Sequence, residues 1–174
     1  YLTTGYYRIQ DLREYSIDIV KSNDLVKLNN NYKITTFNIG FGAYNHDFSF
    51  FMDKGEMLDG TKKQGVLSTA ISKDVVIDNT NGIINEIGKL NPDFMLYQEV
   101  DVESTRSHKV NQYEMLDNKF NTYNSLLVNN FHSRFLFYPI LNPMGSVDSG
   151  IVTSSNKYIE KTIRHKLEID ESFI

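Results

Sequence analysis

The stretch from residue 73 to residue 101 constrains the fold of this chain more than any other. Apolar residues recur at helical spacing as far as Leu90, and the Asn91-Pro92 pair then stops the pattern. Four apolar residues follow, too few for a globular helix, and we interpret them as a strand buried on both faces. A helix that leads directly into a buried strand indicates an α/β protein. The apolar residues concerned are Val76, Ile83, Ile84, Ile87, Phe94, Met95, Leu96 and Tyr97.

An earlier strand is predicted over residues 32–41, YKITTFNIGF. With the helix over 73–90 and the strand after it, this segment makes a strand, loop, helix, strand crossover, which favours parallel pairing of the two strands. Parallel pairing brings both carboxyl ends to one edge of the sheet, where ligands bind in open α/β sheets. We therefore expect Asn38 and Glu99 to be neighbours.

Weaker patterns describe the rest of the chain. A strand over residues 14–20 is expected to form a hairpin with the strand over 32–41 through a turn at 29–31. Residues 40–70 are rich in Gly, Asp and Asn and are predicted to be one long loop. Further predictions are a helix over 109–120 and strands over 123–130 and 149–155. A last strand is predicted over 158–169, with an apolar side on which His165 is core-facing or makes a cross-sheet contact. The apolar residues of that side are Ile159, Ile163, Leu167 and Ile169.

Composition limits the kinds of site that the chain can form. The net charge of −4 provides no global positive field for nucleic acid or an anionic membrane, and the lack of cysteine excludes disulfides and zinc-thiolate sites. No apolar run reaches the roughly 18 residues of a membrane span. Because the sequence starts at Tyr1, we expect a signal or membrane anchor upstream.

Candidate chemistry centres on Asn38 and Glu99, since a carboxylate with a supporting amide suits Mg²⁺. The alternative reading of Glu99 is a solvated carboxylate where a strand emerges. Arg106 and His108, just after the same strand, could contact a phosphate, because arginine pairs with phosphate through two hydrogen bonds. Their alternative role is to cap the following helix or to lie in solvent.

Three motifs taken together resemble the endonuclease/exonuclease/phosphatase superfamily, whose members include deoxyribonucleases and sphingomyelinases. They are TFNIGFGAY at 36–44, PDFMLYQEVD at 92–101 and SGIVTSSNKYI at 149–159. The likeness is greatest to extracytoplasmic bacterial members with an amino-terminal membrane anchor, which implies the extracytoplasmic side of the cell membrane, with the cytoplasm as the alternative. The resemblance implies an α/β fold, a four-layer α/β/β/α sandwich, and hydrolysis of a phosphoester by water with Mg²⁺ or Mn²⁺. Glu99 would be a metal ligand and a catalytic residue. Asn38 would belong to the same metal and catalytic site and would orient the Glu99 carboxylate.

The chain departs from the family pattern in its carboxyl-terminal part. The family's later Asp-x-Asn motif, second histidine and final Asp-His pair have no counterpart after Ser155. We therefore expect residues 1–31 to be an amino-terminal segment and 32–174 the amino-terminal portion of the domain. Its partner would be the remaining carboxyl-terminal half, with the general base and the other metal ligands, so the chain alone would be inactive.

The substrate class stays open at this point. A nucleic acid, a lipid headgroup and a small phosphoester all fit the resemblance, and the lack of a dense Lys and Arg cluster favours the last two. A different class of function is a non-catalytic binding or scaffold protein on the same fold, since a fold does not fix its chemistry.

Overall fold

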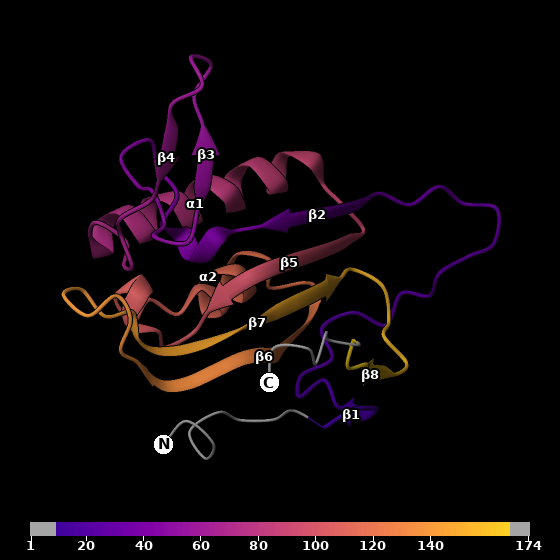
Figure 1. Ribbon diagram of the computed structural model, residues 1–174. Coiled ribbons are helices and arrows are strands. Elements are labelled where there is room, and N and C mark those ends of the chain that lie inside the picture. Colours follow the sequence, from indigo (N-terminus) through magenta and orange to yellow (C-terminus); the bar gives the residue numbers. More distant parts are fainter. Residues whose placement is uncertain (1–9, 168–174) are drawn as a thin grey trace.

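The computed structural model describes residues 10–167, which form a mixed α/β structure around one four-stranded sheet (Figure 1). The strand order is β2-β5-β7-β6, with β2 parallel to β5 and the other pairs antiparallel. The parallel pair confirms the predicted crossover. The elements of this unit are β2 (Ile34–Asn38), α1 (Lys73–Leu90), β5 (Phe94–Asp101), α2 (Gln112–Lys119), β6 (Asn124–Leu136) and β7 (Gly145–Ser155).

Helix α1 has the predicted bounds. The side chain of Ser72 accepts a hydrogen bond from the Val75 N–H at its start, and Asn91 ends it in the left-handed conformation. Helix α2 is shorter than predicted because Asn111 caps it by accepting from the Glu114 N–H. A separate 3-10 turn, η2 (Thr105–Ser107), lies a few residues before that cap.

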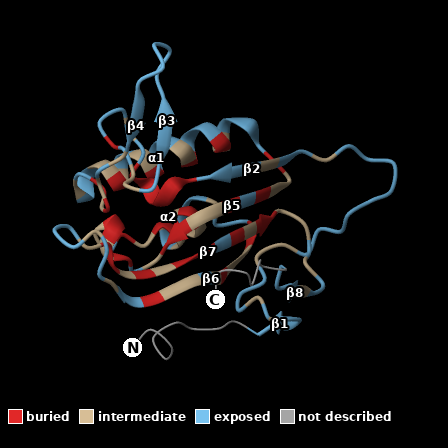
Figure 2. Ribbon diagram, in the orientation of Figure 1, coloured by how far each residue is buried: buried red, intermediate tan, exposed pale blue. Residues whose placement is uncertain are grey.

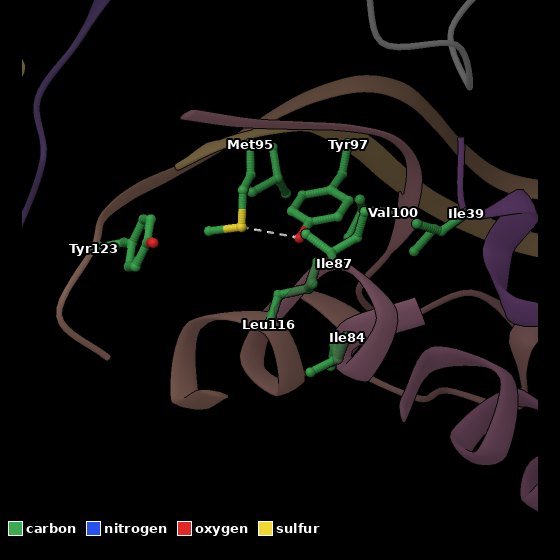
Figure 3. Close-up of a cluster of buried hydrophobic side chains, with 9 residues drawn as sticks. Ile39, Ile84, Ile87, Met95, Tyr97, Val100, Leu116 and Tyr123 are labelled. Carbon is green, nitrogen blue, oxygen red and sulfur yellow. Dashed lines mark hydrogen bonds between the residues drawn. The ribbon is translucent and has the colours of Figure 1, made fainter. Parts of the chain in front are cut away.

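Both helices pack on the same face of the sheet. Figure 2 shows the buried residues along β5, β7 and α1. Met95 and Tyr97 point from β5 toward the helices in Figure 3, and Val152 of β7 belongs to the same buried cluster. They are met by Ile84 and Ile87 of α1 and by Leu116 of α2. This cluster is the main core, and it fixes β5 against the helix that precedes it.

The opposite face of the sheet is exposed. Leu96, Ile151 and Ile34 lie on it and keep exposed fractions of 37%, 40% and 64%. The prediction that β5 is buried on both faces is therefore wrong, because within residues 10–167 the two helices cover one side of the sheet only.

The predicted amino-terminal hairpin is also wrong. Strand β1 (Arg13–Tyr15) pairs with β8 (Thr162–Arg164), while β2 pairs with β5. The chain after β1 instead runs along the sheet, where the backbone N–H groups of Lys21 and Ser22 both donate to the Asn124 side chain. The segment after β1 is therefore held by β6 and does not pair with β2.

The last predicted strand is reduced to the three residues of β8. Ile163 and Leu167 are 41% and 80% exposed, and His165 is exposed as well, so the expected apolar side and the core-facing histidine are not observed. The cause is the short partner β1, which makes a two-stranded ribbon without a core of its own. Ile169 lies outside the described residues.

Residues 40–70 contain more structure than the predicted loop. They begin with the turn η1 (Gly40–Gly42) and include a hairpin of β3 (Lys54–Glu56) and β4 (Lys62–Gln64), which projects from the body in Figure 1. Asp59-Gly60 lies at its tip, with Gly60 at a φ of +82°. Asp-Gly is a strong hairpin signal, so this element was readable from the sequence.

Strands β6 and β7 extend beyond their predicted bounds and form a long antiparallel hairpin.

Neither α1 nor α2 is long and apolar enough to cross a bilayer, and the same holds for every helix within residues 10–167.

Candidate functional site

Asn38 and Glu99 meet at the carboxyl ends of β2 and β5, as predicted. The parallel register places Asn38 beside Gln98, and the Asn38 Nδ2 donates to Glu99 Oε1 at 3.0 Å. Asn38 is exposed and Glu99 is half-buried. A carboxylate is thus held at the edge of the sheet with its orientation set by a neighbouring amide.

The backbone at Glu99 is strained. The register of β5 against β7 shifts between Tyr97 and Val100, and inside this bulge Glu99 has a φ of +56°. A left-handed conformation costs a non-glycine residue about 1–3 kcal/mol, and such residues cluster at functional sites. The bulge lets Val100 enter the core while Glu99 turns toward Asn38.

The turn after β2 holds Asn38 from its other end. Gly40, Phe41 and Gly42 have φ values of +52°, +44° and +69°, a left-handed turn that favours glycine. The Gly40 N–H donates to Asn38 Oδ1 at 2.9 Å. Both polar ends of the Asn38 side chain are therefore engaged, one by the turn and one by Glu99.

A cleft of about 630 Å³ opens beside this pair. It lies between the end of β2, the turn η1 and one side of α1. The lining contains three carboxylates and no Lys, Arg or His. Its residues are Phe37, Asn38, Ile39, Gly40, Gly42, Tyr44, Asp78, Asn79, Gly82, Ile83, Glu86 and Glu99.

Tyr44 is a cleft residue that the sequence did not single out. Its hydroxyl donates to Asp53 Oδ2 at 3.0 Å. Burial raises the pKa of Tyr44, and the hydrogen bond to Asp53 and the negative charges of Asp53 and Glu99 raise this pKa further. The phenol therefore stays protonated at neutral pH. No local sequence pattern predicts the contact between Tyr44 and Asp53, because both residues lie in a segment without regular periodicity.

Arg106 and His108 are engaged within the protein, and neither lines the cleft. Arg106 is 7% exposed and makes a two-point ion pair with Asp101 at 2.9 and 3.0 Å. The His108 Nε2 lies 2.7 Å from the Ala70 carbonyl oxygen. Phosphate contact by either side chain stays a prediction.

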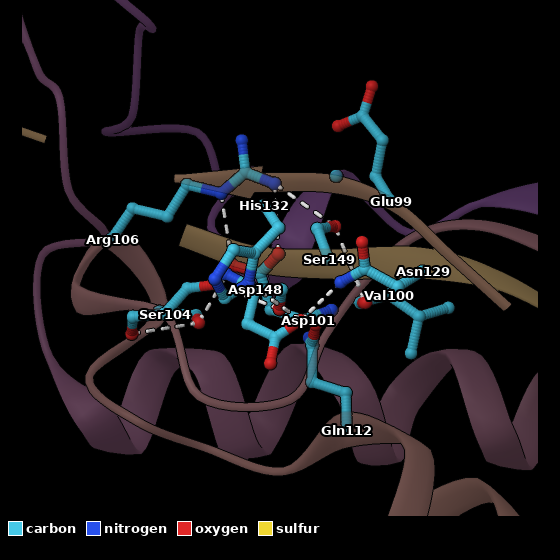
Figure 4. A network of polar contacts seen from close by, with 12 residues as sticks. Glu99, Val100, Asp101, Ser104, Arg106, Gln112, Asn129, His132, Asp148 and Ser149 are labelled. Atoms are coloured by element: carbon cyan, nitrogen blue, oxygen red, sulfur yellow. Dashed lines mark hydrogen bonds and ion pairs between the residues drawn. The ribbon is translucent and has the colours of Figure 1, made fainter. Parts of the chain in front are cut away.

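A buried hydrogen-bond network around Asp101 lies next to the site. Asp101 is fully buried and also accepts from the Ser107 hydroxyl at 2.9 Å, while Arg106 donates to Ser149. The Arg106 guanidinium lies 4.0 Å from the centre of the Phe41 ring, so the network contacts the left-handed turn. Figure 4 shows Arg106 with Asp101 and Ser149, and the Glu99 carboxylate is directed away from them.

The chemistry of the site suits a hard cation only in part. Glu99 is a carboxylate ligand at an open edge, and Mg²⁺ takes one or two carboxylates together with waters and phosphate oxygens. Within residues 10–167, no three His, Asp or Glu side chains gather to hold a metal ion. Asn38, in the orientation described, positions Glu99 and has its own oxygen occupied by Gly40.

Comparison of the chain with known protein families, curated proteins and solved structures finds no match.

Proposed function

We propose that this chain carries the metal-binding part of a phosphoester hydrolase that depends on Mg²⁺ or Mn²⁺. The observation that carries the proposal is the Asn38–Glu99 pair, which lies at the carboxyl ends of two parallel strands beside an open cleft, with Glu99 on a strained bulge. The three motifs that resemble the endonuclease/exonuclease/phosphatase superfamily add the reaction class.

The residues divide the work as follows. Glu99 would hold the metal ion, and Asn38 would keep the Glu99 carboxylate in place through its amide. When bound, the ion neutralises phosphate charge and stabilises the leaving oxygen. The general base and the remaining ligands would come from the carboxyl-terminal half that the resemblance implies.

The four-layer sandwich is part of this proposal. A second sheet would pack on the face that now exposes Leu96, Ile151 and Ile34, because two facing sheets form a shared apolar core. The extracytoplasmic side of the cell membrane likewise stays a prediction from the resemblance.

Replacement of Glu99 by Gln tests the metal site. The amide keeps the shape of the side chain and removes the charge that attracts the ion. We expect hydrolysis of a generic phosphodiester by the complete protein to fall by more than about 100-fold. Asn38→Ala should cost roughly 10- to 100-fold, as is typical of groups that orient a ligand.

Manganese binding, followed by electron paramagnetic resonance, adds a readout that does not need turnover. Glu103→Gln is the matched control, since Glu103 is an exposed carboxylate a few residues beyond the bulge. Loss of Mn²⁺ binding in Glu99→Gln but not in Glu103→Gln supports the proposal. Equal binding by both variants and the wild type removes Glu99 from the site and favours the non-catalytic binding function.

A further inference from the structure

Tyr44 connects the candidate site to a more distant part of the same segment. Its ring lies against the turn η1, and its hydroxyl donates to Asp53 Oδ2 at 3.0 Å. Tyr44 also lines the cleft together with Asn38 and Glu99. One side chain therefore contacts both the turn that holds Asn38 and the residue that precedes β3.

The contact between Tyr44 and the turn is close. A Cβ atom built on Gly40 would lie 2.6 Å from Tyr44 Cδ2 and 3.1 Å from Tyr44 Cε2, so the ring fills the space that a side chain at Gly40 would need. The Gly40 N–H donates to Asn38 Oδ1, and Asn38 Nδ2 donates to Glu99 Oε1. A shift of the ring would allow Gly40 to move, and with it the amide that orients Glu99.

Packing holds only part of the Tyr44 ring. The ring makes edge-to-face contacts with Phe41 and Phe48, at centroid distances of 5.8 and 5.0 Å. Those two side chains are 1% and 7% exposed, whereas Tyr44 is 49% exposed. Because burial does not enclose the outer half of the ring, a polar contact at the hydroxyl is needed to fix its position.

Asp53 provides this contact from a backbone that is itself held in place. The Asp53 N–H donates to the Phe50 carbonyl at 2.8 Å, and the Asp53 carbonyl accepts from the Gly65 N–H at 2.9 Å, at the root of the β3–β4 hairpin. A hydrogen bond to a carboxylate is stronger than one between two neutral groups. The hydrogen bond to Asp53 therefore restrains the exposed end of the Tyr44 ring.

We propose that Tyr44 is a positioning residue for the Glu99 carboxylate, and that its hydrogen bond to Asp53 keeps the ring against the turn η1. Tyr44 acts through Gly40 and Asn38 and does not itself hold the metal ion. Its effect on metal affinity rests on the proposed function, whereas its effect on the turn is measured in the metal-free protein.

Hydrogen exchange at the buried Gly40 amide, followed by NMR without metal, tests the positioning. We expect Tyr44→Phe and Asp53→Ala each to speed this exchange by about 2- to 10-fold, the range for loss of one hydrogen bond. The double variant should exchange no faster than either single variant, because both changes remove the same interaction. Asp53→Asn keeps an acceptor oxygen and should retain most of the protection.

Tyr138→Phe is the matched control. Tyr138 is 64% exposed and its ring contacts Phe51, but it does not line the cleft, so its loss of a hydroxyl should leave exchange at Gly40 unchanged. The β7 amides report on overall stability and should keep their wild-type rates in every variant. Wild-type exchange at Gly40 in Tyr44→Phe, or equal acceleration in β7, overturns the proposal.

Manganese binding, followed by electron paramagnetic resonance, gives the second readout. Tyr44→Phe should weaken the affinity for Mn²⁺ by less than the roughly 10- to 100-fold expected of Asn38→Ala, because it acts one contact further from the ion. Faster exchange at Gly40 in a protein that binds no Mn²⁺ supports the positioning and rejects the proposed function. Weaker Mn²⁺ binding by Tyr44→Phe with unchanged exchange at Gly40 overturns the positioning and leaves the proposed function standing.

Discussion

At the scale of single residues, Arg106 shows how a buried charge is accommodated. Its guanidinium is matched by Asp101, and the carboxylate is further satisfied by Ser107. Removal of one partner leaves the other charge buried and unpaired. We expect Arg106→Met to lower the free energy of unfolding by about 3–5 kcal/mol, as measured by urea denaturation.

The double variant Arg106→Met with Asp101→Leu is the control for that experiment. Because it removes both charges, it should recover much of the lost stability. If the double variant is as unstable as the sum of the two single changes, the ion pair is not the source of the effect.

Asp93 gives a prediction for the pH dependence of stability. The hydrogen bond from the Lys33 N–H lowers the pKa of Asp93 below its ordinary 3.8, and Asn156 and Lys157 lower this pKa further. A carboxyl whose pKa is lowered by folding contributes stability above its unfolded pKa and loses it as the pH falls through the folded pKa. Asp93→Asn should therefore destabilise the protein at neutral pH.

The stability difference between wild type and Asp93→Asn should shrink in acid, below the ordinary pKa of 3.8. Thermal unfolding over a pH series measures it. A difference that stays constant from neutral pH down to the acid limit would mean that the Asp93 charge has no part in it.

At the scale of elements, the turn η1 links the site to the helices. A Cβ at Gly42 would lie 2.6 Å from Gln112 Nε2 and 2.9 Å from Val76 Cγ1, in a backbone with positive φ. We expect Gly42→Ala to cost about 1–3 kcal/mol of stability from strain, with a further loss from crowding. Thermal or urea unfolding measures the change.

Gly60→Ala separates those two contributions. Gly60 also has a positive φ, but nothing lies within 4 Å of its Cβ position at the hairpin tip. An alanine there tests backbone strain alone, so the excess loss in Gly42→Ala measures the crowding against α1 and α2. Equal losses of stability at both glycines would show that the side chains around Gly42 move aside without a cost in free energy.

The elements that the sequence predicted are those with a local signal. Helix α1 has a long periodic pattern with a cap and a stop, and its crossover to β5 followed from that pattern. The β1–β8 pair had no such signal, because its partners come from opposite ends of the chain. The β3–β4 hairpin had one in Asp59-Gly60, which the prediction of a long loop overlooked.

The candidate site divides in the same way. The closeness of Asn38 and Glu99 followed from parallel pairing, which needs only the order of the elements. The bulge at Glu99, the Tyr44 contact with Asp53 and the burial of Arg106 depend on how distant segments pack. Sequence periodicity predicts which face of an element a residue lies on, but it contains no information about contacts between distant segments.

At the scale of the whole molecule, the uncovered sheet face predicts association. Apolar side chains such as Leu96 and Ile151 are expected to be covered in a stable assembly, because large apolar patches are uncommon on monomers. We expect the 174-residue chain to self-associate with rising concentration in sedimentation velocity experiments. Leu96→Thr with Ile151→Thr should weaken this association.

Ile140→Thr is the control for the association experiment. Ile140 is 83% exposed, but it lies between β6 and β7 and not on the sheet face. If the wild-type chain stays monomeric at every concentration, the face does not drive association. If Ile140→Thr disrupts association as strongly as the double variant, the contact lies elsewhere.

The position of β2 at the edge of the sheet has a consequence for local opening. Within the described residues, this strand is hydrogen-bonded to β5 alone, whereas β7 lies between two neighbours. Edge segments detach at a lower free energy than the whole molecule unfolds, so β2 amides should exchange with deuterium faster than those of β7. Each such opening separates Asn38 from Glu99 while the remaining core stays folded, so the lifetime of the site is set by one ladder of hydrogen bonds.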